Sequence, residues 1–236
     1  MPGIDSKVVF GSHLDGADGA VTAEDFSIAQ AAKTITFHGS AALDTAQFKW
    51  GTASALFGGV STSYISVPDS DDFFFDANPF TVDLQVRYNV VGSNNFYSQF
   101  VDNNNRVAFR RTGGGTLQFF IISGGSTLAN YTVAWTPSAG TWYHLQVVRD
   151  GTNVYIFVDG VSQTLNVLTA ISTNAVPNLA AAATFASADG GTTGLDGWLD
   201  EIRVSKGIAR NVATFTPPSG PYSVGGGSRM TLMGVG

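Results

Sequence analysis

The sequence predicts an all-β fold, an antiparallel sandwich of two sheets. Over Phe80–Tyr88 apolar residues alternate strictly with polar ones, which is the period of a half-buried strand. The polar set of that strand, expected to face outward, is Thr81, Asp83, Gln85 and Arg87. No segment shows sustained helical periodicity. With 28 glycines, 17 phenylalanines and only 13% charged residues in 236, the composition suits short strands joined by tight turns.

Further short alternating runs between turn signals predict the other strands. In chain order they are Lys7–Phe10, Thr34–Phe37, Ser54–Phe57, Tyr64–Val67, Phe96–Val101, Arg106–Arg110, Leu117–Ile122, Trp142–Arg149, Asn153–Val158, a run from Val161 onward, and Leu195–Val204. Asp150-Gly151 predicts a hairpin turn and Asp159-Gly160 a second tight turn. Thr22–Ala32 fits a loop or a helical turn, and Ala180–Ala183 favours a strand over a helix.

The strand pattern also predicts which residues form the core. These residues are Phe80, Val82, Leu84, Val86, Leu145, Val147, Ile156 and Ile202. A core of this size fits one domain over residues 1–222, followed by a Gly-rich attachment tail over residues 223–236. The tail carries Met230, Leu232 and Met233, which are too apolar for a solvated end, and we expect it to be ordered only where a partner adds contacts.

Charge and cysteine content exclude several classes of function. Twelve basic residues against eighteen acidic ones give a net charge of −6, which disfavours nucleic acid as a partner. The absence of cysteine excludes a disulfide scaffold, a zinc–thiolate site and a cysteine nucleophile. No apolar run approaches the ~18 residues of a membrane span, and the N-terminus lacks a standard signal peptide, so export by that route is not expected.

Three segments resemble the laminin-G-like, concanavalin A-like sandwich family. They are GTASALFGGVSTSYISVPDSDDFFFDANPFTVDLQVRY from Gly51, WYHLQVVRDGTNVYIFVDG from Trp142, and GWLDEIRVSKGIAR from Gly197. The resemblance implies a two-sheet antiparallel jelly roll. It implies little about activity, because this sandwich carries many functions.

Other segments resemble the versions of this domain found on bacteriophage virion proteins and related bacterial surface proteins. They are LDGADGAVTAEDFS, DTAQFKWGTASALFGG and SKGIARNVATFTPPSGPY. This resemblance implies a non-enzymatic structural protein of a tailed-phage particle, as head decoration or cement, or as part of a tail or fibre. It places the protein on the virion, with the bacterial cell surface or secretion without a standard signal peptide as the alternative. Its partners would be capsid or tail proteins and further copies of itself.

A carbohydrate-binding module is the alternative function. It needs exposed aromatic and amide side chains on one concave face, and the candidates are Trp198, Tyr97, Gln99 and Asn104. A sandwich glycosidase is the third hypothesis and is disfavoured, because the E-x-D-x-x-E carboxylate pattern of those enzymes is missing. Asp196, Asp200 and Glu201 come nearest to it, and His144 is expected to be an ordinary strand histidine bonded to a neighbour or to solvent. No catalytic residue is predicted.

Two further sites follow from local clusters. Asp69, Asp71 and Asp72 form an oxygen-rich loop suited to Ca²⁺, although the Gly and terminal Glu of an EF-hand loop are missing. Solvated turn aspartates are the alternative interpretation. Alternation allows Phe74 to point outward between Phe73 and Phe75, which makes it a candidate interface residue, and packing of all three into the end of the sandwich is the alternative. Phe120 and Ile122, on a strand that is apolar on both faces, are further candidate interface residues.

Overall fold

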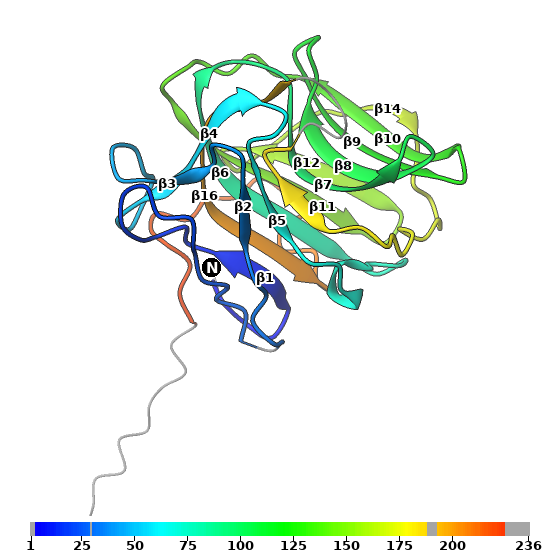
Figure 1. Cartoon of the computed structure of the whole chain (residues 1–236). Coiled ribbons are helices and arrows are strands. Elements are labelled where there is room, and N and C mark those ends of the chain that lie inside the picture. Colours follow the sequence, from blue (N-terminus) through cyan, green and yellow to red (C-terminus); the bar gives the residue numbers. More distant parts are fainter. Residues whose placement is uncertain (1–2, 29, 188–192, 225–236) are drawn as a thin grey trace, which may run out of the picture.

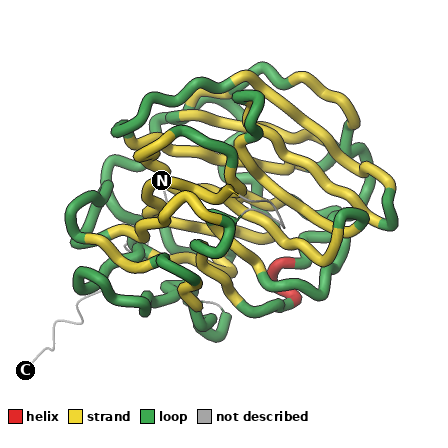
Figure 2. Tube along the Cα trace, turned by 45° about the horizontal axis from the view of Figure 1, so that its top comes forward, coloured by secondary structure: helices red, strands yellow, loops and turns green. Residues whose placement is uncertain are grey.

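Two antiparallel sheets of eight strands each pack face to face, as the sequence predicts (Figure 1). The computed structural model describes residues 3–28, 30–187 and 193–224. Over these residues the chain consists of strands and loops, with one short 3₁₀ turn, η1 (Asp71–Phe73) (Figure 2). None of the described residues forms a helix of the length and apolarity that a membrane span requires.

Sheet 1 is the sheet that carries the candidate site described below. From one edge to the other its strands are β13 (Val161–Ser162), β12 (Asn153–Val158), β11 (Trp142–Asp150), β6 (Phe80–Val90), β16 (Thr193–Lys206), β4 (Ser54–Val60) and β3 (Ala42–Asp44). β1 (Val8–Ser12) also pairs with β16, beside this path.

Sheet 2 covers the inner face of sheet 1. Its order is β14 (Asn166–Thr169), β10 (Ser126–Ala134), β9 (Thr116–Ser123), β8 (Asn105–Arg111), β7 (Asn94–Asp102), β15 (Ala183–Phe185), β5 (Tyr64–Val67) and β2 (Thr36–His38). In both sheets, neighbouring strands pair in the antiparallel direction.

The predicted core residues all lie between the sheets. Each is at most 1% exposed, so the alternation that selected them is confirmed. The set is Phe80, Val82, Leu84, Val86, Leu145, Val147, Ile156 and Ile202. Burial of such side chains stabilises the fold by about 1.5–3 kcal/mol each.

The outer face of β6 differs from the prediction of a half-buried strand. Thr81, Asp83 and Gln85 are 0–1% exposed, and only Arg87 remains partly open. The reason is that residues 208–222 return across this face: the Thr81 hydroxyl donates to the carbonyl of Ile208 at 3.1 Å. A polar strand face is thus covered by chain that carries no strand pattern of its own.

A buried ion pair fastens this covering segment. The Arg203 guanidinium donates to both oxygens of Asp83, at 3.1 and 2.7 Å, and to the carbonyl of Gly3 at 3.0 Å. The Tyr222 hydroxyl donates to Asp83 at 2.7 Å, and the Arg203 guanidinium lies 3.9 Å from the centre of the Tyr222 ring. Both described ends of the chain are therefore anchored at one point of sheet 1.

Three strands, β3, β10 and β14, were not expected from the sequence. β3 and β14 are short edge strands, and the pairing of β10 with β9 shifts register between Thr127 and Ala129, which interrupts its alternation. β15 begins where the predicted stretch Ala180–Ala183 ends. The described part of 22–32 is loop.

The predicted tail begins inside the described structure and continues beyond it. Ser223 and Val224 still contact the N-terminal segment, since the N–H of Ile4 donates to the carbonyl of Ser223 at 2.8 Å and Ile4 pairs with Val224. Residues 225–236, with Met230, Leu232 and Met233, lie outside the described residues, and the expected docking of the tail stays a prediction.

Candidate functional site

Three of the four tryptophans lie on the outer surface of sheet 1. Trp135 is the exception, because it is 9% exposed and packs against three other aromatic rings of the core. Trp50, Trp142 and Trp198 are each half-buried. In the part of the chain that the structure describes, none of these three indoles contacts another aromatic ring. Ring stacking therefore does not cover their faces, and a cation lies over two of them, Trp50 and Trp198.

Strand register brings two of these indoles into one line. Trp198 on β16 pairs with Arg87 on β6, and Arg87 pairs with Trp142 on β11. Directly paired residues point to the same face, and this face is the outer one because the alternating neighbours Leu199 and Val86 are fully buried. Trp198, Arg87 and Trp142 are called the tryptophan row below. Two strand spacings separate the backbone positions of its two tryptophans by about 10 Å.

The ring of Trp198 is fixed by two contacts. Its indole N–H donates to Oδ2 of Asp44 at 2.6 Å, and the guanidinium of Arg87 stacks over the ring at 4.9 Å from its centre. The strand itself is drawn close at this point, because Gly197 has φ +149° and lies against the backbone of β6. Trp198 is consequently presented in one orientation.

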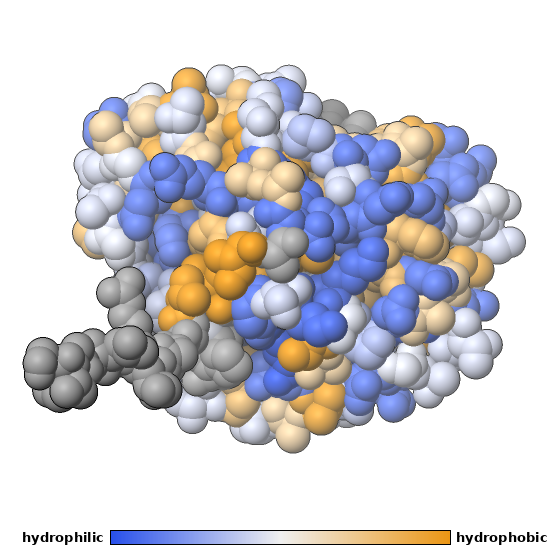
Figure 3. Space-filling view, turned by 90° about the horizontal axis from the view of Figure 1, so that it is seen from below, coloured by the Kyte–Doolittle hydropathy of each residue, from blue (hydrophilic) through white to orange (hydrophobic). Residues whose placement is uncertain are grey.

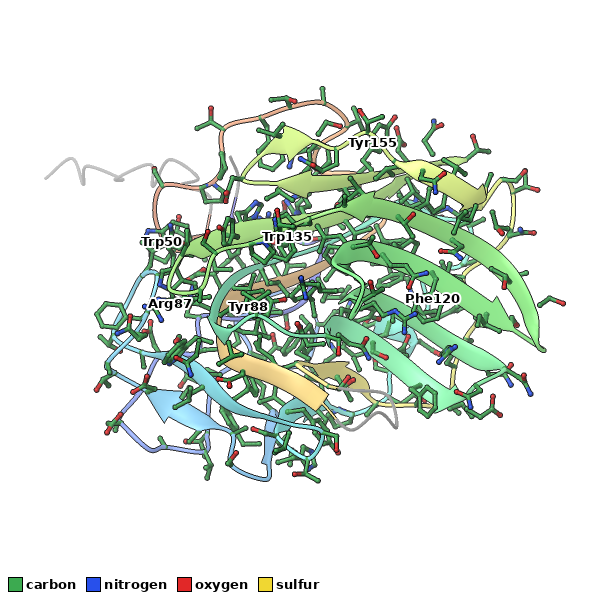
Figure 4. All side chains as sticks on the ribbon, turned by 90° about the horizontal axis from the view of Figure 1, so that it is seen from above. Trp50, Arg87, Tyr88, Phe120, Trp135 and Tyr155 are labelled. Atoms are coloured by element: carbon green, nitrogen blue, oxygen red, sulfur yellow. The ribbon has the colours of Figure 1, made fainter. Side chains whose placement is uncertain are left out.

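The loop that carries Trp50 is tied to the same face by Asp200. This buried carboxylate accepts hydrogen bonds from the backbone N–H groups of Lys49, Trp50 and Glu201, at 2.7, 3.2 and 2.8 Å. Burial raises the pKa of Asp200 to about 7, against the lowering effect of these donors. Asp200 follows Trp198 by two residues, and Figure 4 shows Trp50 and Arg87 at the same end of the molecule.

Polar groups border the row. The side-chain amide of Asn89 donates to Oδ1 of Asp196 at 3.0 Å, and both residues are at least partly exposed. The ammonium of Lys49 lies 5.5 Å from the centre of the Trp50 ring. The face therefore combines flat aromatic surface with amide, carboxylate and cationic groups, which is the chemistry that binds sugar rings and their hydroxyls.

Of the four predicted ligand-binding residues, Trp198 is partly exposed on the outer face of sheet 1, whereas two others are buried and cannot meet a ligand at the surface. Tyr97 and Gln99 are 1% and 2% exposed, and they point between the sheets. A register shift between Asn95 and Tyr97 is the cause, because such a bulge turns consecutive residues to the same side. Asn104 is exposed in the β7–β8 turn of sheet 2 and is not brought together with Trp198.

The sequence did not select Arg87, Trp142 or Trp50 as site residues. Alternation already placed Arg87 outward, and Trp142 shares the parity of His144 and Gln146. The local pattern could not supply the register between β16, β6 and β11, which pairs Arg87 with Trp142, 55 positions away, and with Trp198, 111 positions away.

The three aspartates predicted to hold calcium do not converge. In the described ranges no group of three His, Cys, Asp or Glu side chains is placed to hold a metal ion. Asp72 instead pairs with Lys33 at 2.6 Å, and Asp71 accepts from Asn178 at 3.3 Å. The carboxylates serve local structure at the N-terminus of η1, where Ser70 caps the turn.

Phe74 points outward, as alternation along the three phenylalanines allows, and does not pack into the end of the sandwich with the other two. It is partly exposed while Phe73 and Phe75 are fully buried, and the Lys206 ammonium lies 5.9 Å from its ring centre. Its role as an interface residue stays a prediction.

Phe120 lies on the outer face of β9 but is not exposed there, as an open apolar face would require. It is only 3% exposed, because the guanidinium groups of Arg106 and Arg110 lie over its ring at 5.0 and 4.3 Å. Ile122 is partly exposed. Apolar side chains elsewhere on the surface are scattered, and Figure 3 shows small hydrophobic areas separated by hydrophilic ones on the face seen from below.

The two buried carboxylates among those nearest to a glycosidase pair, Asp200 and Glu201, already form hydrogen bonds within the protein. Asp200 is bound by three backbone N–H groups, as above. Glu201 is 1% exposed; it bonds Nδ1 of His13 at 2.7 Å and accepts from the N–H of Tyr222 at 2.9 Å. Both side chains hold chain segments in place.

His144 is not the hydrogen-bonded strand histidine that the sequence predicts. It is 2% exposed, and neither ring nitrogen has a hydrogen-bond partner. The covering segment places Phe215 edge-on against its ring, at 5.9 Å between centres. Burial lowers the pKa of His144, which keeps the imidazole neutral.

His13 and Glu201 make stability depend on pH. His13 borders a cleft of about 590 Å³ that also includes Asp15, Glu24 and Phe26. Burial by itself would lower the pKa of His13, but the hydrogen bond and charge of Glu201 raise it above its ordinary value. A raised pKa contributes stability that is present below the unfolded-state pKa and lost as pH rises through the folded-state pKa.

We expect His13→Gln to cost more stability at about pH 5 than at about pH 9. Urea unfolding at both pH values checks this expectation. On a Glu201→Gln background the larger loss at low pH should disappear, because the main groups that raise the pKa of His13 against burial are then gone. A difference that stays constant with pH in the Glu201 protein would contradict the assignment.

Comparison with known proteins identifies the family of this domain. Residues 57–213, about two thirds of the chain, match the family described as the concanavalin A-like lectin/glucanases superfamily. The chain belongs to this superfamily. The laminin-G-like sandwich is thereby confirmed. A search of curated proteins found no match.

Several solved structures share the fold of this superfamily domain. Domain 4 of AbnA, a GH43 extracellular arabinanase from Geobacillus stearothermophilus solved in complex with arabinotriose, is 19% identical, with a TM-score of 0.58; the match covers 82% of this chain and 95% of that domain. The binding domain of botulinum neurotoxin serotype G is 12% identical, with a TM-score of 0.65 and coverage of 86% and 48%.

A third similar structure is from botulinum neurotoxin type C, described as dependent on two ganglioside molecules for entering cells. It is 11% identical, with a TM-score of 0.61, and the match covers 86% of this chain and 49% of that one. This chain spans about half the length of the toxin binding domains. At these identities the likeness shows a shared fold.

Proposed function

We propose that this superfamily member is a non-catalytic glycan-binding module whose binding surface is the tryptophan row. One observation carries the proposal: Trp198 and Trp142 are held in register on one face, with Arg87 between them and no other aromatic ring against them. The sugar-bound state of the arabinanase domain and the ganglioside dependence of the type C toxin support this choice among the functions that the fold carries.

The geometry suits an oligosaccharide. The apolar face of a sugar ring stacks on an indole, and hydroxyl groups exchange hydrogen bonds with neighbouring carboxylates and amides. Tryptophans carried two strand spacings apart, about 10 Å, are bridged by a chain of sugars and not by a single ring. Asp196 and Asn89 lie beside Trp198 as hydroxyl partners. Because Asp200 and Glu201 are occupied by structural hydrogen bonds, we propose binding without hydrolysis.

Trp198→Ala is expected to weaken glycan binding by about 30-fold or more, the effect of removing an aromatic hot spot. The measurement is titration calorimetry with oligosaccharides first identified on a glycan array. Tyr155→Ala is the matched control, because Tyr155 is a half-buried aromatic of sheet 1 on β12, well away from Trp50 and Arg87 in Figure 4.

Unchanged binding by Trp198→Ala, with an unchanged melting temperature, would refute the placement of the site. Release of reducing sugar from any bound glycan by the unsubstituted protein would refute the non-catalytic part of the proposal.

A structural role on a bacteriophage particle is the second candidate function. It rests on the resemblance of the N- and C-terminal segments to virion proteins, and the pairing of Ile4 with Val224 supports it, since one anchoring point could carry both described ends. The two functions are compatible on one protein, on a virion or a bacterial surface. Co-sedimentation with purified particles tests the role; a protein that remains in the supernatant contradicts it.

A further inference from the structure

Arg87 is unlike the other arginines of the protein. Of the seven that the structure describes, six donate a guanidinium hydrogen bond to at least one oxygen, from the single bond of Arg106 to the three of Arg203. The Arg87 guanidinium makes no hydrogen bond and no ion pair within the described ranges. It lies over the ring of Trp198, and its Nη2 is beside Gly140.

The stack orients Arg87 without using its donors. A guanidinium that stacks on an aromatic face keeps its N–H groups directed outward in its own plane. There they form a rigid fork that matches a carboxylate through two parallel hydrogen bonds. Trp198 is itself held by Asp44, so the fork has a fixed support. Little side-chain entropy remains to be lost when an anion binds.

The acidic groups around Arg87 are engaged with other donors. Asp44 bonds the Trp198 indole, Asp196 bonds the Asn89 amide, and Asp200 bonds three backbone N–H groups. Lys49, over the ring of Trp50, also forms no ion pair in the described part of the chain. In a protein of net charge −6, two cations are thus left to a ligand at the row.

We propose that the tryptophan row selects glycans bearing a carboxylate, such as a uronic acid, and that Arg87 is the residue that binds this group. The inference rests on the proposed glycan-binding function and names the ligand class of the same site. The indoles supply affinity for the sugar chain, and Arg87 supplies the preference for an acidic sugar over its neutral counterpart. The ligand binds by hydrogen bonds and charge alone.

A glycan array with paired acidic and neutral members identifies the ligands, and each acidic ligand is then reduced chemically from carboxylate to hydroxymethyl. We expect the bound members to be acidic, and both carboxyl reduction and Arg87→Gln to weaken binding by about 10- to 100-fold. Arg87→Lys should restore only part of the affinity, since it keeps the charge and loses the fork. Arg106→Gln, the same charge change on sheet 2, is the control and should bind as the unsubstituted protein does.

The outcomes separate this inference from the proposed function. If only neutral glycans bind, or if Arg87→Gln keeps its affinity for acidic ones, the inference is wrong while the loss of binding in Trp198→Ala still supports the glycan module. If no glycan binds, or if Trp198→Ala binds normally, the proposed function fails and the inference fails with it. An equal loss of affinity in Arg87→Gln and Arg106→Gln would show that net charge alone weakens binding, and it would overturn the role of Arg87.

Discussion

Replacing Asp83 by alanine is expected to lower the free energy of unfolding by about 3–5 kcal/mol, the cost of leaving a buried charge without its partner. Arg203 is 1% exposed and would lose both of its carboxylate hydrogen bonds, and the Tyr222 hydroxyl would lose its acceptor. The covering segment over β6 would then be held only by its remaining contacts. Urea or guanidinium unfolding measures the change.

Asp5→Ala is the matched control. It breaks the other aspartate–arginine pair, Asp5 with Arg210 at 2.9 Å, whose carboxylate side chain is 30% exposed. Solvent reaches the carboxylate of this pair but barely reaches the Arg210 side chain, which is 4% exposed, so its loss should cost less than that of the fully buried Asp83–Arg203 pair. If the two variants were equally destabilised, burial could not be what gives the Asp83–Arg203 pair its importance.

The stability that Asp83 contributes should also decline in acid. Burial by itself would raise the pKa of Asp83, but the charge and hydrogen bonds of Arg203, with that of Tyr222, hold it below its ordinary value. A carboxyl with a lowered pKa contributes stability above the unfolded-state pKa and loses it as pH falls through the folded-state pKa. The difference between the original protein and Asp83→Ala should shrink over that interval.

Gly197→Ala is expected to destabilise the protein by about 3 kcal/mol or more, from overpacking and backbone strain together. A Cβ at this position would lie 2.1 Å from the carbonyl oxygen of Arg87 and 2.9 Å from Cα of Tyr88. Those atoms belong to the backbone of β6, which cannot move aside without breaking its pairing with β16. The same displacement would shift Arg87 against Trp198, so glycan binding should fall together with stability.

Gly92→Ala is the control for this substitution. No atom lies within 4 Å of a Cβ built there, and we expect a change within about 0.5 kcal/mol. Thermal melting and array binding are measured for both variants. Equal stability of Gly197→Ala and Gly92→Ala would show that β16 and β6 are not packed as closely as described.

The alternation along β6 shows how far local pattern reaches. Side chains of a strand alternate by geometry, so the sequence alone predicted that Phe80, Val82, Leu84 and Val86 face the core and that Arg87 faces away. It could not predict that Thr81, Asp83 and Gln85 would be covered too, because the chain over them comes from residues 208–222. The predicted exposure of Tyr97 and Gln99 is wrong for a related reason. One bulge beside Tyr97 turns both side chains to the inner face of sheet 2.

The sequence by itself determined the fold class and the outward direction of Arg87, because hydrophobic periodicity and turn residues act over a few neighbouring positions. Only the tertiary structure decided that Trp142 and Trp198 share the face of Arg87 and that these three side chains form one row. Register between β16, β6 and β11 depends on turns and packing across more than a hundred residues, and a shift of one position would send each of them to the other face. The binding surface is therefore a property of strand pairing, which no local segment of the chain contains.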